Sequence, residues 1–567
     1  MSILRAILAG WLLLAGAALV LAWPHASRPG LFYEEAHGAA MARDFLTGRA
    51  HPHLPGSAFL AIGDRLLPTF VQSYGGALKS WLLLPSFAVF GASQPVLRMT
   101  ALGFALAGLL LFMLWTGRWL GRDTALLAGA LLALDPAWFF VNVLDWGPVF
   151  PSFVCRFACF YFGLRAWQAW SAPGADARSG SLCALFAGLF AGLGFFNKVD
   201  FAVILGGVLL ALACCHARRI GSLVASQPRN RIVRPLALAS LGFLLAAGPM
   251  LTHVPRILLG DLSNHGAPER GQPELAEKLD VAAAMYDGTY FYRLMDQGGR
   301  FDRMDDAHPP IRAPLGVALA LAAGVLIAGR AGTFILLAAL FITVGVFAMP
   351  GAVRIHHLVS VYPFPHLAVA LAVTRLSERG SRWLSATAAA LVALLLASQL
   401  AAILGTQRVI RETGGRGWWS DALTAFAREV RDRSDTTIAS LDWGFGEQLV
   451  FLTDGPTLVE PFWSRDASLE RSPDTIFLVH PREYQLFPLG ERALEDARSA
   501  APGSVEIRAW RDREGAVAFY SLRWTAVSPR AAPRARPVRS GSRSSRRRGA
   551  AAPGRSRACA RRAAAPV

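Results

Sequence analysis

Residues 99–117 read MTALGFALAGLLLFMLWTG, an unbroken run without a charged side chain. A helix of this length is long enough to cross the hydrocarbon core of a bilayer. Apolar runs of similar length recur along the chain, which has 567 residues, 53% of them hydrophobic and only 17% charged. The pattern predicts an α-helical polytopic membrane protein.

The apolar runs predict about eleven membrane spans. They lie near residues 3–23, 99–117, 124–143, 150–170, 182–197, 201–216, 235–252, 313–329, 333–349, 355–374 and 383–404. The short arginine-bearing loops all fall on one side of these spans. Because basic loops stay in the cytoplasm, we predict a cytoplasmic N-terminus and an outer C-terminal region. The motif LAWPHAS is a poor cleavage site, so the first run is expected to remain as a span.

The remaining sequence divides the chain into three regions. We predict a transmembrane domain over residues 1–405, with large outer loops at 24–98 and 253–312. Within the first loop, GALKSWLLLPSFAVFG (residues 76–91) is too short to span and suits a helix lying along the membrane surface.

Residues 406–527 have a different pattern from the spans. Helical periodicity alternates there with short β-type runs, and SVEIRAWRDREGAVAFYSLRW is typical of a hairpin around Gly515. This predicts a small outer soluble α/β domain. Residues 528–567 contain almost nothing that can build a core, and we predict an Arg-rich disordered tail.

The net charge is concentrated in that tail. The chain carries a formal +18, but twelve arginines and no acid lie between Arg530 and Arg562, which leaves +6 for the rest. The basic character therefore does not indicate a nucleic-acid partner. The six cysteines show neither a CxxC pattern nor His/Cys ligand spacing, so we predict no disulfide and no metal site.

Three acidic residues fall at the predicted outer boundary of the membrane. They are Glu34 and Glu35 in RPGLFYEEAHGAA (residues 28–40) and Asp145 in NVLDWGPVFP (residues 142–151). Acids in the first turn of a helix are favoured by about 0.3–1 kcal/mol by the helix dipole, and an aspartate at a span end is typical of a cap. The same placement suits a general base, which must take a proton from a hydroxyl. We predict all three as catalytic residues, with the structural readings left open.

Basic residues share this boundary. They are Arg98, Lys198, Arg354, His356 and His357. A lysine in the position of Lys198, within FFNKVDF, is also typical of a side chain that reaches to the interface. A collection of ionisable groups from several spans on one side indicates a site. We predict that these five residues bind a donor phosphate.

Acids and bases together favour one chemistry. A carboxylate base beside cationic phosphate holders suits transfer of a group from a lipid phosphate to a hydroxyl. The base activates the acceptor, and the cations stabilise the phosphate as it leaves. This chemistry calls for no cofactor.

Four stretches of the chain, in this order, resemble the C-type glycosyltransferases of family 39, which include protein O-mannosyltransferases and the aminoarabinose transferase acting on lipid A. They are LFYEEAHGAAMARDFLTG, FAVFGASQPVLRMTALGFALAG, GLFAGLGFFNKVDF and RIHHLVSVYPFPHLAVALAV. The resemblance covers roughly residues 1–405. It implies a polyprenyl-phosphate sugar donor, inverting transfer at the outer face, and no nucleotide-binding domain.

The resemblance also implies roles for individual residues. Family members carry Asp-Glu in the first outer loop, with the Asp as base or acceptor binder, and Glu34 and Glu35 align with this pair. Glu at the first position departs from the family. Asp145 corresponds to a second outer acid, and Lys198, Arg354, His356 and His357 look like the donor-phosphate side. The acceptor is expected to be a protein, a lipid or a glycan.

Other classes of protein remain open at this point. A transporter or flippase of a lipid-linked glycan predicts charges deep within several spans and often a repeat, whereas these spans read as mostly uncharged. A non-catalytic scaffold and an outer glycan polymerase or ligase are further alternatives. High Ala, Arg and Gly contents are compatible with a GC-rich bacterium, in which the protein lies in the inner membrane and its outer side is periplasmic.

Overall fold

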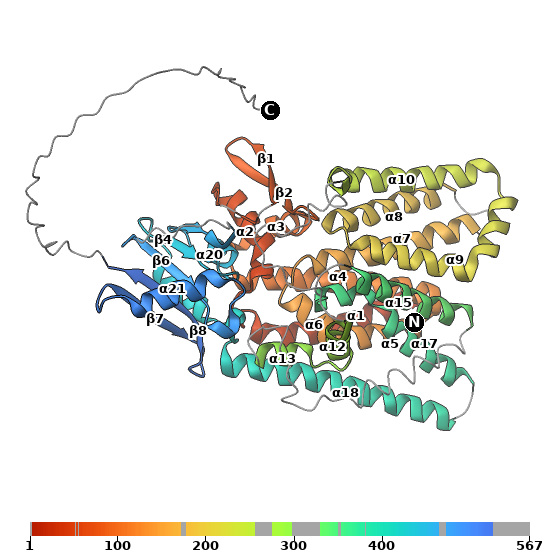
Figure 1. The fold of residues 1–567 in the computed structure, drawn as a ribbon. Coiled ribbons are helices and arrows are strands. Elements are labelled where there is room, and N and C mark those ends of the chain that lie inside the picture. The colour runs from red at the N-terminus through yellow and green to blue at the C-terminus, as the bar shows by residue number, and fades with distance from the viewer. Residues whose placement is uncertain are drawn as a thin grey trace, which may run out of the picture. The chain divides into compact units, whose positions relative to one another are not determined.

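The computed structural model describes residues 3–525, except for residues 52, 55, 172–176, 256–274, 297–328, 350–352, 380–381 and 464–471. Residues 1–525 form one compact unit. Helices dominate its membrane part, and a mixed sheet forms near the C-terminus (Figure 1).

Within the described ranges, nine helices are long and apolar enough to cross a membrane, or ten if one bent pair counts as a span. Their elements are α1 (Ile3–Ala22), α4 (Gln94–Leu120), α5 (Arg122–Ala133) with α6 (Pro136–Val143), α7 (Val149–Ser171), α8 (Ala177–Asn197), α9 (Phe201–Ser226), α10 (Arg229–Leu251), α15 (Arg330–Ala348), α16 (Ile355–Leu358) with η3 (Val359–Val361) and α17 (Phe364–Glu378), and α18 (Arg382–Thr413). The chain is therefore a multi-pass membrane protein. The predicted span at 313–329 falls outside the described residues, apart from its last one.

The break between α5 and α6 follows from its sequence. Pro136 has no N–H to donate, and the Asp135 carboxylate instead accepts the backbone N–H of Trp138 at 2.9 Å. The two helices meet at 62°. Asp135 also accepts the hydroxyl of Tyr362 at 3.0 Å and lies 3.2 Å from Nε2 of His366.

A few charged residues nevertheless lie within the mostly apolar spans. Arg156 lies in α7 with 2% of its surface exposed, and its guanidinium donates to the carbonyls of Val359 and Tyr362 at 3.1 and 2.5 Å. These buried groups are paired with polar partners, which makes their burial tolerable.

The membrane-side loops form further elements. They are η1 (Trp23–His25), α2 (Tyr33–Thr47), β1 (Ala58–Ile62), β2 (Arg65–Gln72), β3 (Gly75–Gly76), α3 (Leu78–Phe90), α12 (Leu275–Tyr286) and α13 (Tyr290–Asp296). The three strands form an antiparallel sheet in the order β1-β2-β3. The α3 helix is apolar and too short to span, as the sequence indicates.

The predicted α/β region is confirmed. It contains η4 (Gly417–Trp419), α19 (Ala422–Val430), β4 (Thr437–Ser440), α20 (Gly446–Leu452), β5 (Thr457–Val459), η5 (Pro461–Trp463), β6 (Thr475–Val479), η6 (Arg482–Tyr484), α21 (Pro488–Ser499), β7 (Val505–Arg511) and β8 (Val517–Trp524). The sheet order is β5-β4-β6-β8-β7. Strands β5, β4 and β6 are parallel, and β8 is antiparallel to β6 and β7. Gly515 has the φ of 91° that the expected β7–β8 turn requires.

The core of the α/β region extends into the membrane part. Alternate residues of β4 and β6 face opposite sides, where Ile438 and Leu478 pack with α19 and α20, and Ala439 and Phe477 pack with α21. The α19 and α20 side also takes in residues of α2 and α3 such as Ala39. In Figure 1, α2 and α3 lie between the sheet and the helical bundle. The predicted boundary at 405–406 falls inside α18.

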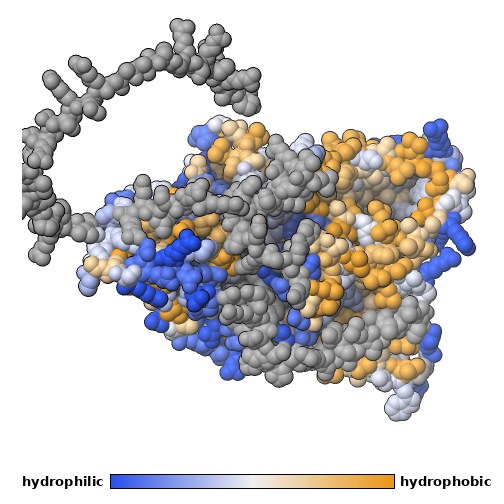
Figure 2. Space-filling model, in the orientation of Figure 1, coloured by the Kyte–Doolittle hydropathy of each residue, from blue (hydrophilic) through white to orange (hydrophobic). Residues whose placement is uncertain are grey.

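The surface follows the same division. Figure 2 shows apolar side chains gathered over α8, α9 and α10, and hydrophilic ones over the α/β region on the same face. Exposed leucines such as Leu209, Leu210 and Leu245 lie on α9 and α10. A broad apolar surface of this kind is expected where helices contact lipid.

Candidate active site

The helix α2 begins beside the candidate site and carries two of its predicted residues. Phe32 precedes it with an extended backbone, and Glu35 in the first turn accepts the Phe32 N–H at 3.2 Å. Gly48 ends the helix with φ 70°. Glu34 and Glu35 thus lie at the positive end of the helix dipole, as predicted. Their side chains point into different surroundings.

The Glu34 carboxylate is partly exposed and lies beside Trp146 and His356. Its side chain is 36% exposed, and Oε2 accepts the indole N–H of Trp146 at 2.5 Å and lies 3.7 Å from Nδ1 of His356. Burial raises the pKa of Glu34 above its ordinary value, while the Lys198 charge, the Trp146 hydrogen bond and the Arg354 charge oppose that rise. A carboxyl group with a raised pKa and an open side is suited to exchange a proton.

Glu35 is fully buried and holds Arg98. The Arg98 Nε and Nη2 atoms contact the two carboxylate oxygens at 2.5 and 2.9 Å. The same guanidinium donates to the carbonyls of His25, Pro29 and Gly30. Neither side chain has any exposed surface. This geometry favours a structural role over the catalytic role predicted for Glu35 and the phosphate-binding role predicted for Arg98.

Asp145 is also enclosed. Its carboxylate has no exposed surface and pairs with Lys79 at 2.8 Å, and Lys79 further donates to the carbonyl of Glu35 at 2.9 Å. Burial raises the pKa of Asp145 to about 8, although the Lys79 charge opposes this. The pair fastens the α6–α7 turn to α2 and α3. The structure therefore favours a positioning role for Asp145 over direct contact with a substrate.

A small cleft of about 20 Å³ lies next to His356. It is lined by Pro148, Val149, Ser152, Arg156, Gly194, Asn197, Lys198, Asp200, His356, Val359 and Ser360. Lys198 contacts Asp200 at 3.0 Å. Burial, the largest single influence, lowers the pKa of Lys198. The Asp200 charge and hydrogen bond together with the Tyr74 and Glu34 charges outweigh burial, so the net direction is upward and the ammonium is charged. Asn197 is 1% exposed and donates to the carbonyl of Pro148 at 2.8 Å.

The predicted Arg354–His357 group contributes mainly through His356. The α16 helix begins after Arg354, whose backbone N–H donates to Nδ1 of His357 at 3.2 Å. This hydrogen bond assigns His357 to the helix start. Arg354 is half-buried, and its charge acts on Glu34. The structure thus brings Glu34, Lys198, His356 and Arg354 to one place.

Sequence analysis missed three residues of this region. Lys79 lies in the apolar helix α3, where a lone lysine signals a buried partner. Arg156 is an isolated charge within α7, which is the stronger signal because an unpaired charge there is costly. Trp146 directly follows Asp145 and has no signal in sequence, since its role depends on where α2 lies.

An aromatic residue of the α/β region packs beside the site. Trp419 stacks on Phe32 with ring centres 4.1 Å apart and lies 5.3 Å from Trp146. Gly30 makes this approach possible: its N–H donates to the Trp419 carbonyl at 2.7 Å, and a Cβ there would lie 2.2 Å from the Ser420 oxygen. A side chain at Gly30 would push the α/β region away from α2.

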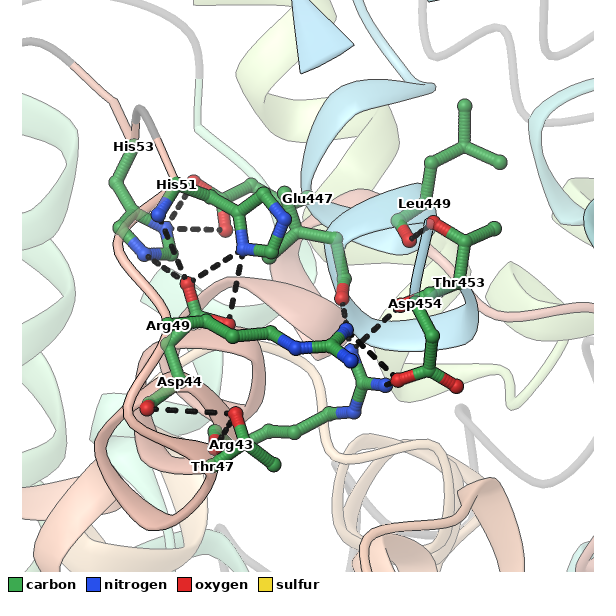
Figure 3. Close-up of polar contacts among 11 residues, drawn as sticks. Arg43, Asp44, Thr47, Arg49, His51, His53, Glu447, Leu449, Thr453 and Asp454 are labelled. Carbon is green, nitrogen blue, oxygen red and sulfur yellow. Dashed lines mark hydrogen bonds and ion pairs between the residues drawn. The ribbon is translucent and has the colours of Figure 1, made fainter. Parts of the chain in front are cut away.

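The other end of α2 is held by ion pairs, shown in Figure 3. Arg43 is buried and donates to the carbonyls of Val450 and Thr453 at 2.6 and 2.8 Å, and it pairs with Asp454. His53 lies between Asp44 and Glu447, with contacts of 3.3 and 3.1 Å. Both ends of the helix are therefore attached to the α/β region.

The surroundings of His53 and Asp44 favour the charged forms of both side chains. Burial disfavours the His53 cation, but the Glu447 and Asp44 carboxylates raise the pKa of His53 to about 10. Burial likewise opposes the Asp44 anion, and hydrogen bonds from His51 and His53 lower the pKa of Asp44 to about 2. Across the described residues, no group of three or more His, Cys, Asp or Glu side chains is arranged to hold a metal ion.

Solved structures share this architecture. ArnT from Cupriavidus metallidurans bound to undecaprenyl phosphate has a TM-score of 0.57 at 14% identity, covering 90% of this chain and 97% of that chain. The apo state of the same protein gives 0.55 at 14% identity, covering 91% and 98%. The archaeal oligosaccharyltransferase AglB from Archaeoglobus fulgidus, in complex with an inhibitory peptide and a dolichol-phosphate, gives 0.48 at 14% identity, covering 81% and 64%. No protein-family model and no curated protein matches the chain.

The match to ArnT establishes the fold of this chain. It extends over nearly the whole length of both proteins, so it includes the helical bundle and the α/β region. The predicted C-type glycosyltransferase fold, a polytopic helical protein with a C-terminal α/β region, is therefore confirmed.

Proposed function

We propose that the chain is a membrane glycosyltransferase that moves a sugar from a polyprenyl-phosphate donor to an acceptor hydroxyl. One observation carries this proposal: the partly exposed Glu34 carboxylate lies 3.7 Å from His356, which lines a cleft that also contains Lys198 and Arg156. A base next to a cationic cleft provides the two functions that the transfer needs. The fold shared with ArnT, solved with bound undecaprenyl phosphate, supports the lipid-phosphate donor.

The proposed mechanism is an inverting displacement. Glu34 takes the proton of the acceptor hydroxyl as the oxygen attacks the anomeric carbon of the donor sugar. The bond from that carbon to the phosphate oxygen breaks on the opposite side, and the phosphate keeps the electron pair. Lys198, Arg354 and His356 stabilise the departing phosphate. Glu35, Arg98 and Asp145 position the helix and turn around Glu34.

The proposed orientation follows from the arginine-bearing loops. The N-terminus is cytoplasmic, and α2 and the α/β region lie on the outer side of the inner membrane. The acceptor, which is a protein, a lipid or a glycan, then reaches Glu34 from that side. The α/β region borders the approach because Trp419 packs against Phe32.

The test is transfer of labelled sugar from a panel of polyprenyl-phosphate donors by the purified protein in lipid. Glu34→Gln should reduce turnover by about 10²–10⁴-fold while donor binding persists. Lys198→Ala should weaken donor binding. Glu412→Gln is the matched control, because Glu412 is an exposed glutamate that pairs with Arg408 in α18.

A negative result favours the other classes. Folded protein that neither binds nor turns over any donor would favour a transporter or a scaffold. Turnover by Glu34→Gln at the wild-type rate would exclude Glu34 as the base while leaving the enzyme class intact.

A further inference from the structure

Trp146 makes a contact that the mechanism above does not use. It lies in the turn between α6 and α7, is 1% exposed, and its indole N–H donates to Oε2 of Glu34 at 2.5 Å. A hydrogen bond to a carboxylate is short and roughly twice as strong as one between neutral groups. The other acids of this region, Glu35 and Asp145, instead pair with charged partners.

The indole is enclosed by its neighbours. The preceding residue, Asp145, adopts φ 46°, an uncommon value for a residue with a side chain, and its carboxylate pairs with Lys79. Phe32 and Trp419 pack on the indole with ring centres 5.2 and 5.3 Å away. These contacts restrict the position of the ring and so the direction of its N–H.

We propose that Trp146 is a positioning residue for Glu34. The indole N–H of Trp146 orients the Glu34 carboxylate toward the acceptor hydroxyl and favours the ionised form of the carboxylate. The inference rests on the proposed function, because it assigns Glu34 as the base. It also gives the α/β region a part in the reaction, since Trp419 of that region packs on the indole. Catalysis then depends on an element more than 380 residues away from Glu34 in sequence.

The charges around Glu34 determine the expected pH dependence. Groups that face it are Lys198, Arg354, Lys79, His356, Tyr74 and Tyr290. Burial raises the pKa of Glu34, and the Trp146 hydrogen bond is among the interactions that oppose this. Removing the N–H should therefore raise the pKa further. A base must be ionised to act, so the acid limb of the kcat profile should move to higher pH, by about one unit.

The primary experiment compares Trp146→Phe with Trp138→Phe. Both residues are buried tryptophans, but the indole N–H of Trp138 has no hydrogen-bond partner among the described residues. The two variants thus lose the same atoms, and only one loses a contact with Glu34. We expect Trp146→Phe to shift the acid limb of kcat upward and leave the donor KM near the wild-type value. Trp138→Phe should shift neither.

A second measurement needs no turnover. Ionisation of Glu34 should change the near-ultraviolet absorption of Trp146, giving a difference spectrum that titrates with pH in lipid-embedded protein. The signal should vanish in Glu34→Gln and in Trp146→Phe and persist in Trp138→Phe. Comparing Glu34→Gln with wild type tests the contact even if Trp146→Phe does not fold.

The two measurements separate the failure of the inference from the failure of the proposed function. A titrating spectrum without any sugar transfer supports the contact and refutes the glycosyltransferase. Transfer with equal pH profiles for Trp146→Phe, Trp138→Phe and wild type overturns the positioning role. A difference spectrum that is unaffected by Glu34→Gln also overturns it.

Discussion

Glu34 and Glu35 are neighbours in one helical turn, yet their surroundings are opposite. Glu34 keeps 36% of its side chain exposed, accepts one neutral N–H donor at 2.5 Å, and lies near a cationic cleft. Glu35 has no exposed surface and is matched atom for atom by Arg98. A step of one residue rotates a helical side chain by about 100°, which is enough to separate a reactive group from a structural one.

The difference in exposure and partners indicates that Glu34, and not Glu35, is the member of the acidic pair that can act on a substrate. The Glu35–Arg98 pair is satisfied by its own hydrogen bonds and three backbone carbonyls. Such a pair loses much free energy when one partner is removed. The Glu34 carboxylate can still accept a hydrogen bond from a substrate, and its pKa is raised by burial. Three of the four predictions below test this division, and one tests the contact at the other end of α2.

The largest effect is expected from Arg98→Met. This variant leaves the Glu35 carboxylate buried without its cation, which should lower the free energy of unfolding by about 3–5 kcal/mol. Reversible unfolding in mixed micelles measures it. The double variant Arg98→Met with Glu35→Gln should recover part of the loss because no charge is left unpaired. A loss below about 1 kcal/mol in the single variant would contradict the structural role of the pair.

The next effect is expected from Glu34→Asp, which restores the residue type of the family that the sequence resembles. The shorter side chain draws the carboxylate back by one methylene and away from Trp146. Misplacement on this scale should lower turnover by about 10²-fold with stability retained. The measurement is kcat with the preferred donor, with Glu35→Asp as the companion whose stability should fall instead. Higher turnover in Glu34→Asp would show that the site is not fitted to glutamate.

Sequence reasoning predicted the elements that repeat a simple pattern. Uncharged runs such as residues 99–117 correspond to helices, and alternating residues of β4 and β6 correspond to the two faces of the sheet. The place of Glu34 in the first turn of a helix also followed from sequence. These features depend on local periodicity, which is readable without knowing the tertiary contacts.

The distinction between Glu34 and Glu35 was beyond sequence reasoning. It depends on Arg98, 63 residues away, and on Trp146, 112 residues away from Glu34. Asp145 was predicted as catalytic because it shares the predicted outer boundary with the Glu pair, and its pairing with Lys79 in another element could not be read from the sequence. A partner set by packing leaves no trace in the spacing of residues. The grouping of Glu34 with basic residues was therefore predictable, while the partner of each charge was not.

The other end of α2 carries a second buried charged group, in which His53 lies between Asp44 and Glu447. The folded-state pKa of His53 is about 10, above the unfolded value of about 6.5. The stability it contributes should therefore be complete below about pH 6.5 and be lost as pH rises through about 10. The Asp44 pKa of about 2 places the corresponding loss on the acid side, below about pH 4.

Unfolding measured from pH 7 to about pH 9 tests this contact. Wild-type stability should fall over that range, and the fall should be smaller in His53→Gln. His51→Gln is the matched control, because His51 also contacts the Asp44 carboxylate but its side chain is more exposed than that of His53. An equal alkaline slope in wild type and His53→Gln would show that His53 does not carry the charge assigned to it.

The smallest effect, and the sharpest form of the comparison, is the stability of Glu34→Gln. The amide keeps the shape of the side chain and can still accept the Trp146 N–H. It leaves no buried charge without a partner, because Lys198 remains in its ion pair with Asp200. The free energy of unfolding should change by no more than about 0.5 kcal/mol. The same substitution at Glu35 should be strongly destabilising, since it leaves Arg98 buried beside a neutral amide. Equal losses at both positions would mean that Glu34 is held as firmly as its neighbour, and its carboxylate would not be available to an acceptor as the proposed chemistry requires.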